Sequence, residues 1–215
     1  IYFADRNTGI RRIGVNERNL ALSTSDAKYD YFVQNNRLEY YGNPWQYGAM
    51  NACFAKADGL WYWGKTYGGG GIFRFAESDI SPVDISRGTN PPYPTIFPDE
   101  FVKSFVIDAT NQILYAVIRD KGLYAVPLTD ITANDATKTN TKAESKYLVA
   151  SFKSDSEGSV GEYVDVCQMV LDSSDGSVYF GLRAEEGSSE TSGIKRWNPT
   201  TKKLETIVSG VNVYG

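Results

Sequence analysis

One kind of hairpin recurs four times along this chain of 215 residues, and the repetition limits the possible folds more than any other feature. In each copy an apolar residue followed by an aromatic residue opens a short strand. The openings are Ile1-Tyr2, Leu60-Trp61, Leu114-Tyr115 and Val178-Tyr179. The second strand then begins with glycine and an aliphatic residue, at Gly9, Gly71, Gly122 and Gly193. Because fixed repeats indicate modules that cover one another, the chain is expected to contain four copies of one structural unit.

Each hairpin is expected to belong to a unit of four antiparallel strands. An apolar run ending in a turn signal precedes the last three hairpins, as NACFAKADG, KSFVIDATNQ and VCQMVLDSSDG. Asp, Asn and Gly supply the turn conformations at low cost. Fourth strands are expected at residues 20–24, 82–86, 147–151 and 204–209. The units recur at intervals of about 60 residues, which suits a four-stranded unit with its loops.

The strands are often apolar on both faces, as in LWYW, ILYAVI and VCQMVL. Each small sheet therefore needs cover on both sides, which the radial stacking of a β-propeller supplies. A flat sandwich would predict cleaner in–out alternation. We predict an all-β fold in which residues 1–215 form a single β-propeller domain of about four four-stranded antiparallel blades. Residues 31–41, YFVQNNRLEYY, are expected to form another hairpin around Asn35-Asn36. A fifth blade is therefore an alternative to four.

The two ends of the sequence are compatible with two arrangements. Residues 211–215 read as a first strand, which could complete the blade begun at Ile1 and close a ring. Alternatively, the chain is part of a larger propeller. Ile1 in place of Met suggests cleavage of a leader or trimming of a longer chain.

The stretch IYFADRNTGIRRIGV resembles one blade hairpin of the NHL and YWTD propeller families. In those families an apolar-aromatic strand, an aspartate and a glycine-led Ile/Arg strand recur. The aspartate is Asp5 here, and the corresponding spots in the other units are Gly64, Ile118 and Leu182. The resemblance implies a propeller, and related propellers mostly bind proteins or glycans. A minority, such as the gluconolactonase-like group, are metal-dependent hydrolases.

A basic residue occurs five positions after each strand opening, at Arg6, Lys65, Arg119 and Arg183. Equivalent positions in a propeller share one rim, where four like charges would raise the local potential despite a formal net charge of −4. We therefore predict that these residues bind a protein or glycan ligand of anionic character. Trp45 and Tyr47 lie outside the repeat and are candidates for stacking on sugars. The alternative is that each basic group ends a strand in water or pairs with a nearby acid.

The composition excludes several functions. The chain has no histidine, which removes His-based triads and most zinc sites. No block of like charges accompanies the acidic balance, so a nucleic acid is not an expected partner. No apolar stretch approaches the ~20 residues of a membrane span.

We therefore expect a non-catalytic binding domain without cofactor or metal. A calcium-dependent lactonase-like hydrolase and a structural propeller within a larger assembly are the alternatives. The sequence lacks an Asn-X-Ser/Thr acceptor, because Asn198-Pro199-Thr200 contains proline, which favours a bacterial origin. A secreted or cell-envelope location is expected.

The remaining local features have simple interpretations. In GLWYWGKTYGGGGIFRF, Lys65 precedes the glycines and a strand follows them, so the run is a connection between strands and not a phosphate loop. Asp172 to Gly176 is predicted to be a turn, since the later ligands of a calcium loop are missing. Residues 90–98 are expected to form an extended connection or a partner-binding segment, and residues 130–146 a solvated excursion. Cys53 and Cys167 are either two buried thiols or a long-range disulfide.

Overall fold

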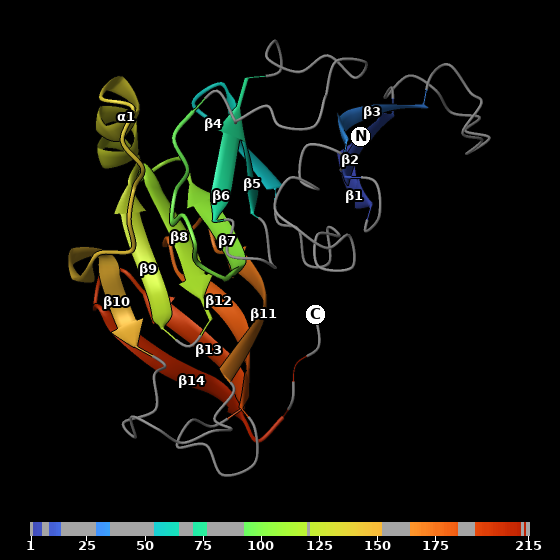
Figure 1. The fold of residues 1–215 in the computed structure, drawn as a ribbon. Coiled ribbons are helices and arrows are strands. Elements are labelled where there is room, and N and C mark those ends of the chain that lie inside the picture. The colour runs from blue at the N-terminus through green and yellow to red at the C-terminus, as the bar shows by residue number, and fades with distance from the viewer. Residues whose placement is uncertain are drawn as a thin grey trace.

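Antiparallel strands make up most of the regular structure (Figure 1). The computed structural model describes residues 2–5, 9–13, 29–34, 54–64, 71–76, 93–119, 121–151, 164–184, 192–211 and 213. The strands are β1 (Tyr2–Asp5), β2 (Gly9–Ile13), β3 (Tyr29–Gln34), β4 (Phe54–Ala57), β5 (Leu60–Gly64), β6 (Ile72–Phe75), β7 (Val102–Asp108), β8 (Ile113–Ile118), β9 (Gly122–Pro127), β10 (Leu148–Ser151), β11 (Val164–Leu171), β12 (Val178–Ala184), β13 (Gly193–Asn198) and β14 (Lys203–Ser209). One α-helix, α1 (Leu128–Ala136), and one 3₁₀ turn, η5 (Ser145–Tyr147), accompany them. The predicted all-β class is confirmed.

The strands form four sheets in which sequence neighbours pair. The sheets are β1–β3, β4–β6, β7–β10 and β11–β14, and every pairing within them is antiparallel. The four predicted hairpins are β1/β2, β5/β6, β8/β9 and β12/β13. The last two sheets have the predicted four strands in order.

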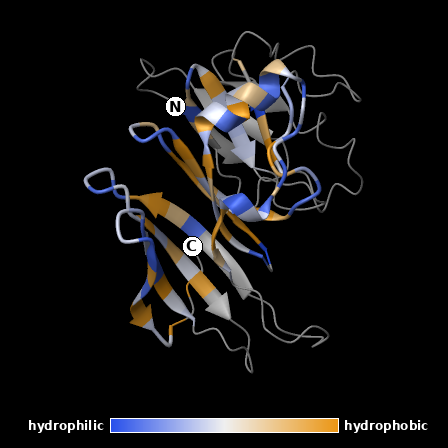
Figure 2. Ribbon diagram, turned by 90° about the vertical axis from the view of Figure 1, so that its left-hand side faces the viewer, coloured by the Kyte–Doolittle hydropathy of each residue, from blue (hydrophilic) through white to orange (hydrophobic). Residues whose placement is uncertain are grey.

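Sheet β7–β10 is covered on both faces, as the apolar character of its strands predicts. Leu114, Ala116 and Ile118 of β8 lie in one core with residues of the preceding sheet, among them Tyr62 and Ile72. Tyr115 and Val117 point the other way, because successive strand residues alternate, and they lie in a second core. That core includes Val178, Phe180 and Leu182 of β12. The last three sheets therefore stack in chain order, with apolar positions along their strands (Figure 2).

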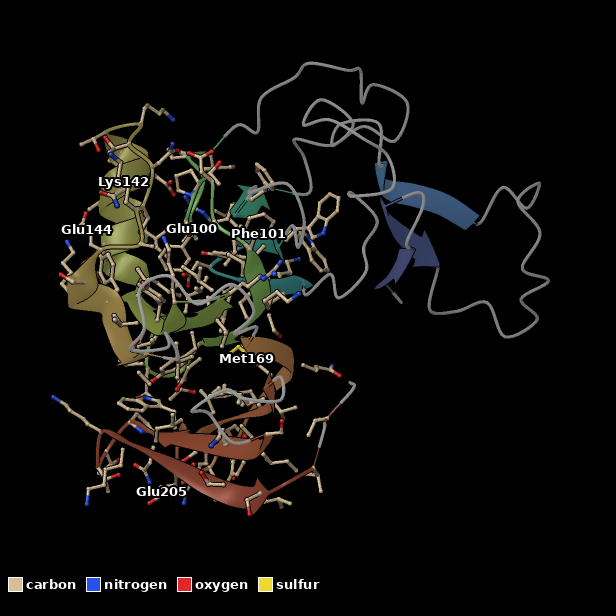
Figure 3. The ribbon with its side chains drawn as sticks, turned by 60° about the horizontal axis from the view of Figure 1, so that its bottom comes forward. Glu100, Phe101, Lys142, Glu144, Met169 and Glu205 are labelled. Atoms are coloured by element: carbon tan, nitrogen blue, oxygen red, sulfur yellow. The ribbon has the colours of Figure 1, made fainter. Side chains whose placement is uncertain are left out.

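The first strands of the last two sheets are joined directly. The Met169 amide of β11 donates a hydrogen bond to Ser104 Oγ of β7, at 3.1 Å. Both strands carry a β-bulge near this point, between Val102 and Ser104 and between Val166 and Met169. Bulges bend a strand and increase its twist, so both strands are expected to bend near the point at which they meet. Figure 3 shows Met169 between the two sheets.

The fourth strands of the first two units differ from the prediction. The strand beside β2 is β3, at Tyr29–Gln34, and the expected 20–24 lies outside the described residues. Only the beginning of the expected hairpin at 31–41 is described, within β3. In the second sheet, Ile96 forms an antiparallel bridge with Ile72 of β6. The prediction assigned this place to residues 82–86, which also lie outside the described residues. Ile96 is fully buried, so the proline-rich segment contributes to the core as well as connecting units.

Residues 130–146 lie between β9 and β10 as predicted, but they are not simply a solvated excursion. Helix α1 occupies the first part, directly after Pro127, which stands at the N-cap without a side-chain hydrogen bond. Leu128 and Ile131, one turn apart, are buried against the core that sheet β7–β10 shares with β4–β6. Polar side chains dominate the rest of the segment, so its overall composition did not indicate that Leu128 and Ile131 form a short apolar stripe.

The register corrects the alignment of the second unit by one residue. Tyr115 and Tyr179 each lie opposite the third residue after the strand-opening glycine, namely Ala125 and Arg196. In the second unit that place belongs to Tyr62, which pairs with Arg74, and not to Trp61. Trp61 is also buried, but on the opposite face. In the first unit Tyr2 pairs with Arg12 in the same way.

Candidate functional site

Sheet β7–β10 is an antiparallel meander, so the turn between its second and third strands, β8 and β9, lies at one end of the sheet. In β7–β10 this turn follows Ile118, which pairs with Gly122. Beside it lie Glu100 and Phe101, immediately before β7. We call Glu100, Phe101, Arg119 and Lys121 the hairpin edge.

Backbone hydrogen bonds hold the hairpin edge in place. The Arg119 amide donates to the Phe101 carbonyl at 2.9 Å, and the Lys121 amide donates to the Ile118 carbonyl at 3.2 Å. From the preceding sheet, the Gly71 amide donates to the Glu100 carbonyl at 3.3 Å. The last glycine of the GGGG run therefore fixes one unit against the next. Gly71 directly precedes β6, as expected for a connection between strands.

The side chains of the hairpin edge combine a cation, an aromatic ring and an ion pair. The Arg119 guanidinium carbon lies 5.9 Å from the centroid of the Phe101 ring, within the range of a cation–π contact. Phe101 is 38% exposed, so part of the ring remains open to solvent. Lys121 is paired with Glu100, which lies beside Phe101 in Figure 3. This arrangement can offer an apolar surface with a positive charge next to it.

The predicted binding residues are only partly within the described chain. Arg119 is described with its side chain, and Arg183 is described as backbone in β12, directly after Leu182, the partner of Gly193. That place matches Arg119, since Ile118 is the partner of Gly122. Arg6, Lys65, Trp45 and Tyr47 lie outside the described residues.

The described register reaches the neighbours of the predicted basic residues. Asp5 pairs with Gly9, so Arg6 comes directly after the partner of the glycine in the sequence, as Arg119 and Arg183 do. In the second unit the described register ends with Gly64 opposite Ile72. Lys65 lies outside the described residues, so its alignment with the three arginines stays a prediction.

A buried charge pair outside the predicted site joins the second sheet to α1. Arg74 of β6 is 1% exposed, and both of its terminal nitrogens donate to the carboxylate of Asp135. It also donates to the Pro94 carbonyl at 2.9 Å, and its guanidinium carbon lies 5.8 Å from the Tyr62 ring centroid. Burial raises the pKa of Tyr62 above its usual value, more than Arg74 lowers it. The arginine repeats visibly in the sequence as Arg12, Arg74 and Arg196, but Asp135 sits on a helix that the sequence pattern did not predict.

The turn predicted at Asp172 to Gly176 is confirmed. The Gly176 amide donates to the Asp172 carbonyl at 2.9 Å, and the Ser174 amide and hydroxyl donate to Asp172 Oδ1 at 2.9 and 2.6 Å. Next in the chain, the Ser177 amide and hydroxyl donate to Asp175 at 2.8 and 2.9 Å. These bonds favour the ionised carboxylates, and they hold the pKa of Asp172 and of Asp175 below the usual value.

The lowered pKa values give a test in solution. We expect NMR titration of the side-chain carboxyl groups to find both midpoints below the usual aspartate pKa. Because these pKa values are depressed in the fold, the stability that the turn gains from them is present above the unfolded pKa of about 3.9. It is lost as the pH falls through the folded pKa. Ser174→Ala should raise the Asp172 midpoint and leave that of Asp175; midpoints at or above the usual value would contradict the hydrogen bonding.

The chain is similar to solved structures but matches no known family. No family model matches the sequence, and no curated protein matches it. Among solved structures, the chain is similar to the extracellular domain of the one-component system BT4673 from B. thetaiotaomicron, with a TM-score of 0.48 and 15% identity over 96% of this chain. A second structure, the extracellular domain of BT4673 described as a hybrid two-component system, gives a TM-score of 0.44 and 16% identity over 72% of this chain.

The chain spans 24% of the first of these structures and 18% of the second. Similarity at this level assigns neither a family nor an activity. Within the described ranges, no helix is long and apolar enough to cross a membrane, and no three metal-ligating side chains of His, Cys, Asp or Glu gather in one place.

Proposed function

We propose that this chain is a non-catalytic binding domain, built as a β-propeller or part of one. The hairpin edge and its equivalents in the other sheets would recognise an anionic glycan or an acidic protein segment. The stacking of three meander sheets in chain order, with the middle one covered on both faces, supports the radial arrangement. In such an arrangement the turns between second and third strands gather on one rim. A secreted or cell-envelope location is part of the proposal, and cell fractionation tests it.

The observation that carries the proposal is the contact between Arg119 and the partly exposed Phe101 ring. A sugar presents an apolar C–H face that can stack on an aromatic ring, and a carboxylate or sulfate on that sugar would meet the guanidinium. An acidic peptide with an apolar residue offers the same two groups. Loops on a rigid sheet scaffold are the usual place for such recognition. The charge of Lys121 is offset in part, because Glu100 pairs with it.

Ligand binding is therefore expected to depend on salt. We expect acidic polysaccharides and acidic peptides to bind in an array at about 0.1 M salt and to lose most of their signal near 1 M. The reason is that the screening length shrinks from about 10 Å to about 3 Å over that range. Neutral glycans of the same sugar skeleton serve as the comparison. Equal binding of neutral and acidic ligands at both salt concentrations would contradict an anionic specificity.

Charge reversal at the hairpin edge should weaken this binding. For the best acidic ligand of the array, Arg119→Glu is expected to raise Kd about tenfold or more, roughly 1.4 kcal/mol, as measured by calorimetry. Lys202→Glu makes the same charge change in the exposed turn between β13 and β14, at the other edge of a sheet, and should leave Kd within about twofold. Phe101→Ala should weaken binding to glycans even at high salt. If Arg119→Glu and Lys202→Glu behave alike, the hairpin edge is not the binding site.

A further inference from the structure

The sequence contains two Asp-Gly dipeptides, Asp58-Gly59 and Asp175-Gly176. Each lies in the turn between the first two strands of its sheet, β4 and β5 in one case and β11 and β12 in the other. Because glycine has no side chain, the amide nitrogen that follows the aspartate can approach its carboxyl carbon and close a succinimide ring. The local sequence predicts the same reactivity for both dipeptides, so a difference between them must come from the fold.

The turn at Asp58-Gly59 leaves the reacting groups accessible. These two residues form the whole connection between β4 and β5, since Ala57 pairs with Leu60. Their φ values are +51° and +78°, as in the type I′ turn of a two-residue hairpin. Both residues are exposed, and nothing lies within 4 Å of a Cβ placed on Gly59. Within the described ranges, no residue donates a hydrogen bond to the Asp58 carboxylate or accepts one from the Gly59 amide.

The turn at Asp175-Gly176 holds the same groups in hydrogen bonds. The Ser177 amide and hydroxyl donate to the Asp175 carboxylate at 2.8 and 2.9 Å, and Arg196 Nη2 donates to it at 2.6 Å. The Gly176 amide is buried and donates to the Asp172 carbonyl at 2.9 Å. The carboxylate is itself exposed, at 41%, so exposure does not distinguish the two sites. Closing the ring at Asp175 would require these hydrogen bonds to break.

We propose that Asp58 is a site of spontaneous isomerisation to isoaspartate in the folded protein, whereas hydrogen bonds protect Asp175. In the first step the Gly59 amide nitrogen forms a bond to Cγ of Asp58. The hydroxyl of the protonated carboxyl group leaves Cγ and takes up the amide proton, so that one water is released. Water then adds to the α-carbonyl carbon of the ring and breaks its bond to the Gly59 nitrogen. The main chain now runs through Cβ, with no net change in mass and no oxidant or reductant.

The protonation requirement adds to the difference between the sites. A carboxyl oxygen leaves as water only from the protonated acid. At Asp175 the bonds from Ser177 and Arg196 favour the ionised carboxylate and hold its pKa below the usual value. The protonated form is therefore scarcer there at any mildly acidic pH, in addition to the bonds that must open.

Isoaspartate at position 58 changes the hairpin and creates a new chemical group. The main chain of a two-residue turn becomes one carbon atom longer, directly beside the paired and buried Ala57. The former α-carboxyl group becomes an exposed side-chain carboxylate. That carboxylate is the substrate of isoaspartyl methyltransferases, which esterify it with the methyl group of S-adenosylmethionine. Methyl transfer by such an enzyme therefore serves as a probe for the modified residue.

Ageing of the whole chain in mildly acidic buffer, followed by tryptic peptide mapping, tests the proposal. Cleavage after Lys56 and Lys65 releases Asp58 in one peptide, and cleavage after Lys153 and Arg183 releases Asp175 in another. Isoaspartate gives a second chromatographic peak of unchanged mass, and electron-transfer fragmentation locates it. We expect at least about tenfold more isoaspartate at Asp58 than at Asp175, because opening one charge-assisted hydrogen bond already costs about that factor. In the chain unfolded with urea, both sites should convert at similar rates.

Two serine variants test the cause of the protection. Ser177→Ala removes the hydroxyl that donates to Asp175 and should raise isoaspartate there without changing its level at Asp58. Ser174→Ala removes a hydroxyl that donates to Asp172 in the same turn and should leave both sites unchanged. Matching near-UV circular dichroism shows that both variants are folded.

Three results would overturn the proposal. The first is equal accumulation at Asp58 and Asp175 in the folded wild-type chain, which needs no variant. The second is an Asp58 that stays unmodified in the folded chain while the unfolded chain converts. The third is a folded Ser177→Ala variant in which Asp175 converts no faster than in Ser174→Ala.

Discussion

Replacing Asp135 with alanine is expected to lower the free energy of unfolding by about 3 kcal/mol or more, the largest loss we expect from one surface-accessible residue. The substitution leaves the buried Arg74 guanidinium with the Pro94 carbonyl as its described oxygen partner. An uncompensated buried charge costs far more than the ion pair gains, since the desolvation of the arginine is no longer offset. Urea denaturation followed by tryptophan fluorescence measures the change as a lower midpoint at constant slope.

Two controls make this prediction specific. Glu144→Ala removes one member of the exposed pair with Lys146 and should cost no more than about 1 kcal/mol. The double variant Arg74→Met, Asp135→Ala should recover much of the loss, because an apolar side chain of similar length replaces the stranded cation. If Asp135→Ala costs no more than Glu144→Ala, the pair between β6 and α1 does not hold the two sheets together.

The sequence predicts the units of this fold well, because each hairpin carries its own pattern. In β8, alternate residues face different cores, so ILYAVI contains no polar position at all. A strand that is apolar on both faces is explained when other parts of the protein cover both faces of its sheet. The aromatic of each unit is also in an equivalent position, at Tyr2, Tyr62, Tyr115 and Tyr179. The error of one residue at Trp61 arose because LWYW offers three successive aromatics and its letters alone do not fix the register.

The fourth strands are harder to predict, because they pair at the outer side of a sheet and need little apolar sequence. Strand β14 is exposed at most of its positions, so its side chains hardly distinguish it from a loop. In the second sheet the pairing partner of Ile72 is Ile96, which lies beyond the expected 82–86 and after several prolines. Which segment pairs with β6 depends on how distant parts of the chain pack beside it, and local sequence does not determine this packing.

The candidate site was predictable in kind but not in detail. An arginine recurs after the second strand of a unit, and this recurrence indicated Arg119 and Arg183. Residues at the same position of a repeat are expected to occupy equivalent places in the structure. Phe101 carries no signal of its own in the repeat, because its position against Arg119 follows from the return of the chain to the start of β7. The pairing of Arg74 with Asp135, 61 residues away, likewise depends on how α1 packs.

Gly122→Ala is expected to destabilise the protein by about 3 kcal/mol, because this glycine has backbone atoms where a side chain would be. A Cβ at this position would lie 2.0 Å from the carbonyl oxygen of Ala150 on β10, and the backbone φ is +141°. The same relation recurs at Gly193, where the Val208 carbonyl oxygen of β14 would be 1.9 Å away, and at Gly71, where the Ile96 oxygen would be 2.3 Å away. In the last three units, the glycine at the start of the third strand therefore allows the segment beside that strand to approach, which explains the repetition of glycine there.

The matched control is Gly59→Ala, in the tight turn between β4 and β5. Gly59 also has a positive φ, of +78°, but nothing lies within 4 Å of its hypothetical Cβ. Its substitution should cost only the backbone strain of about 1–2 kcal/mol. Both glycines have a positive φ, but only Gly122 has backbone atoms close to the position of a Cβ. The comparison therefore separates the cost of the steric clash from the cost of the backbone strain. Hydrogen exchange should also locate the damage of Gly122→Ala in the amides that join β9 to β10. Equal losses of stability in the two variants would mean that β10 does not pack against Gly122 as described.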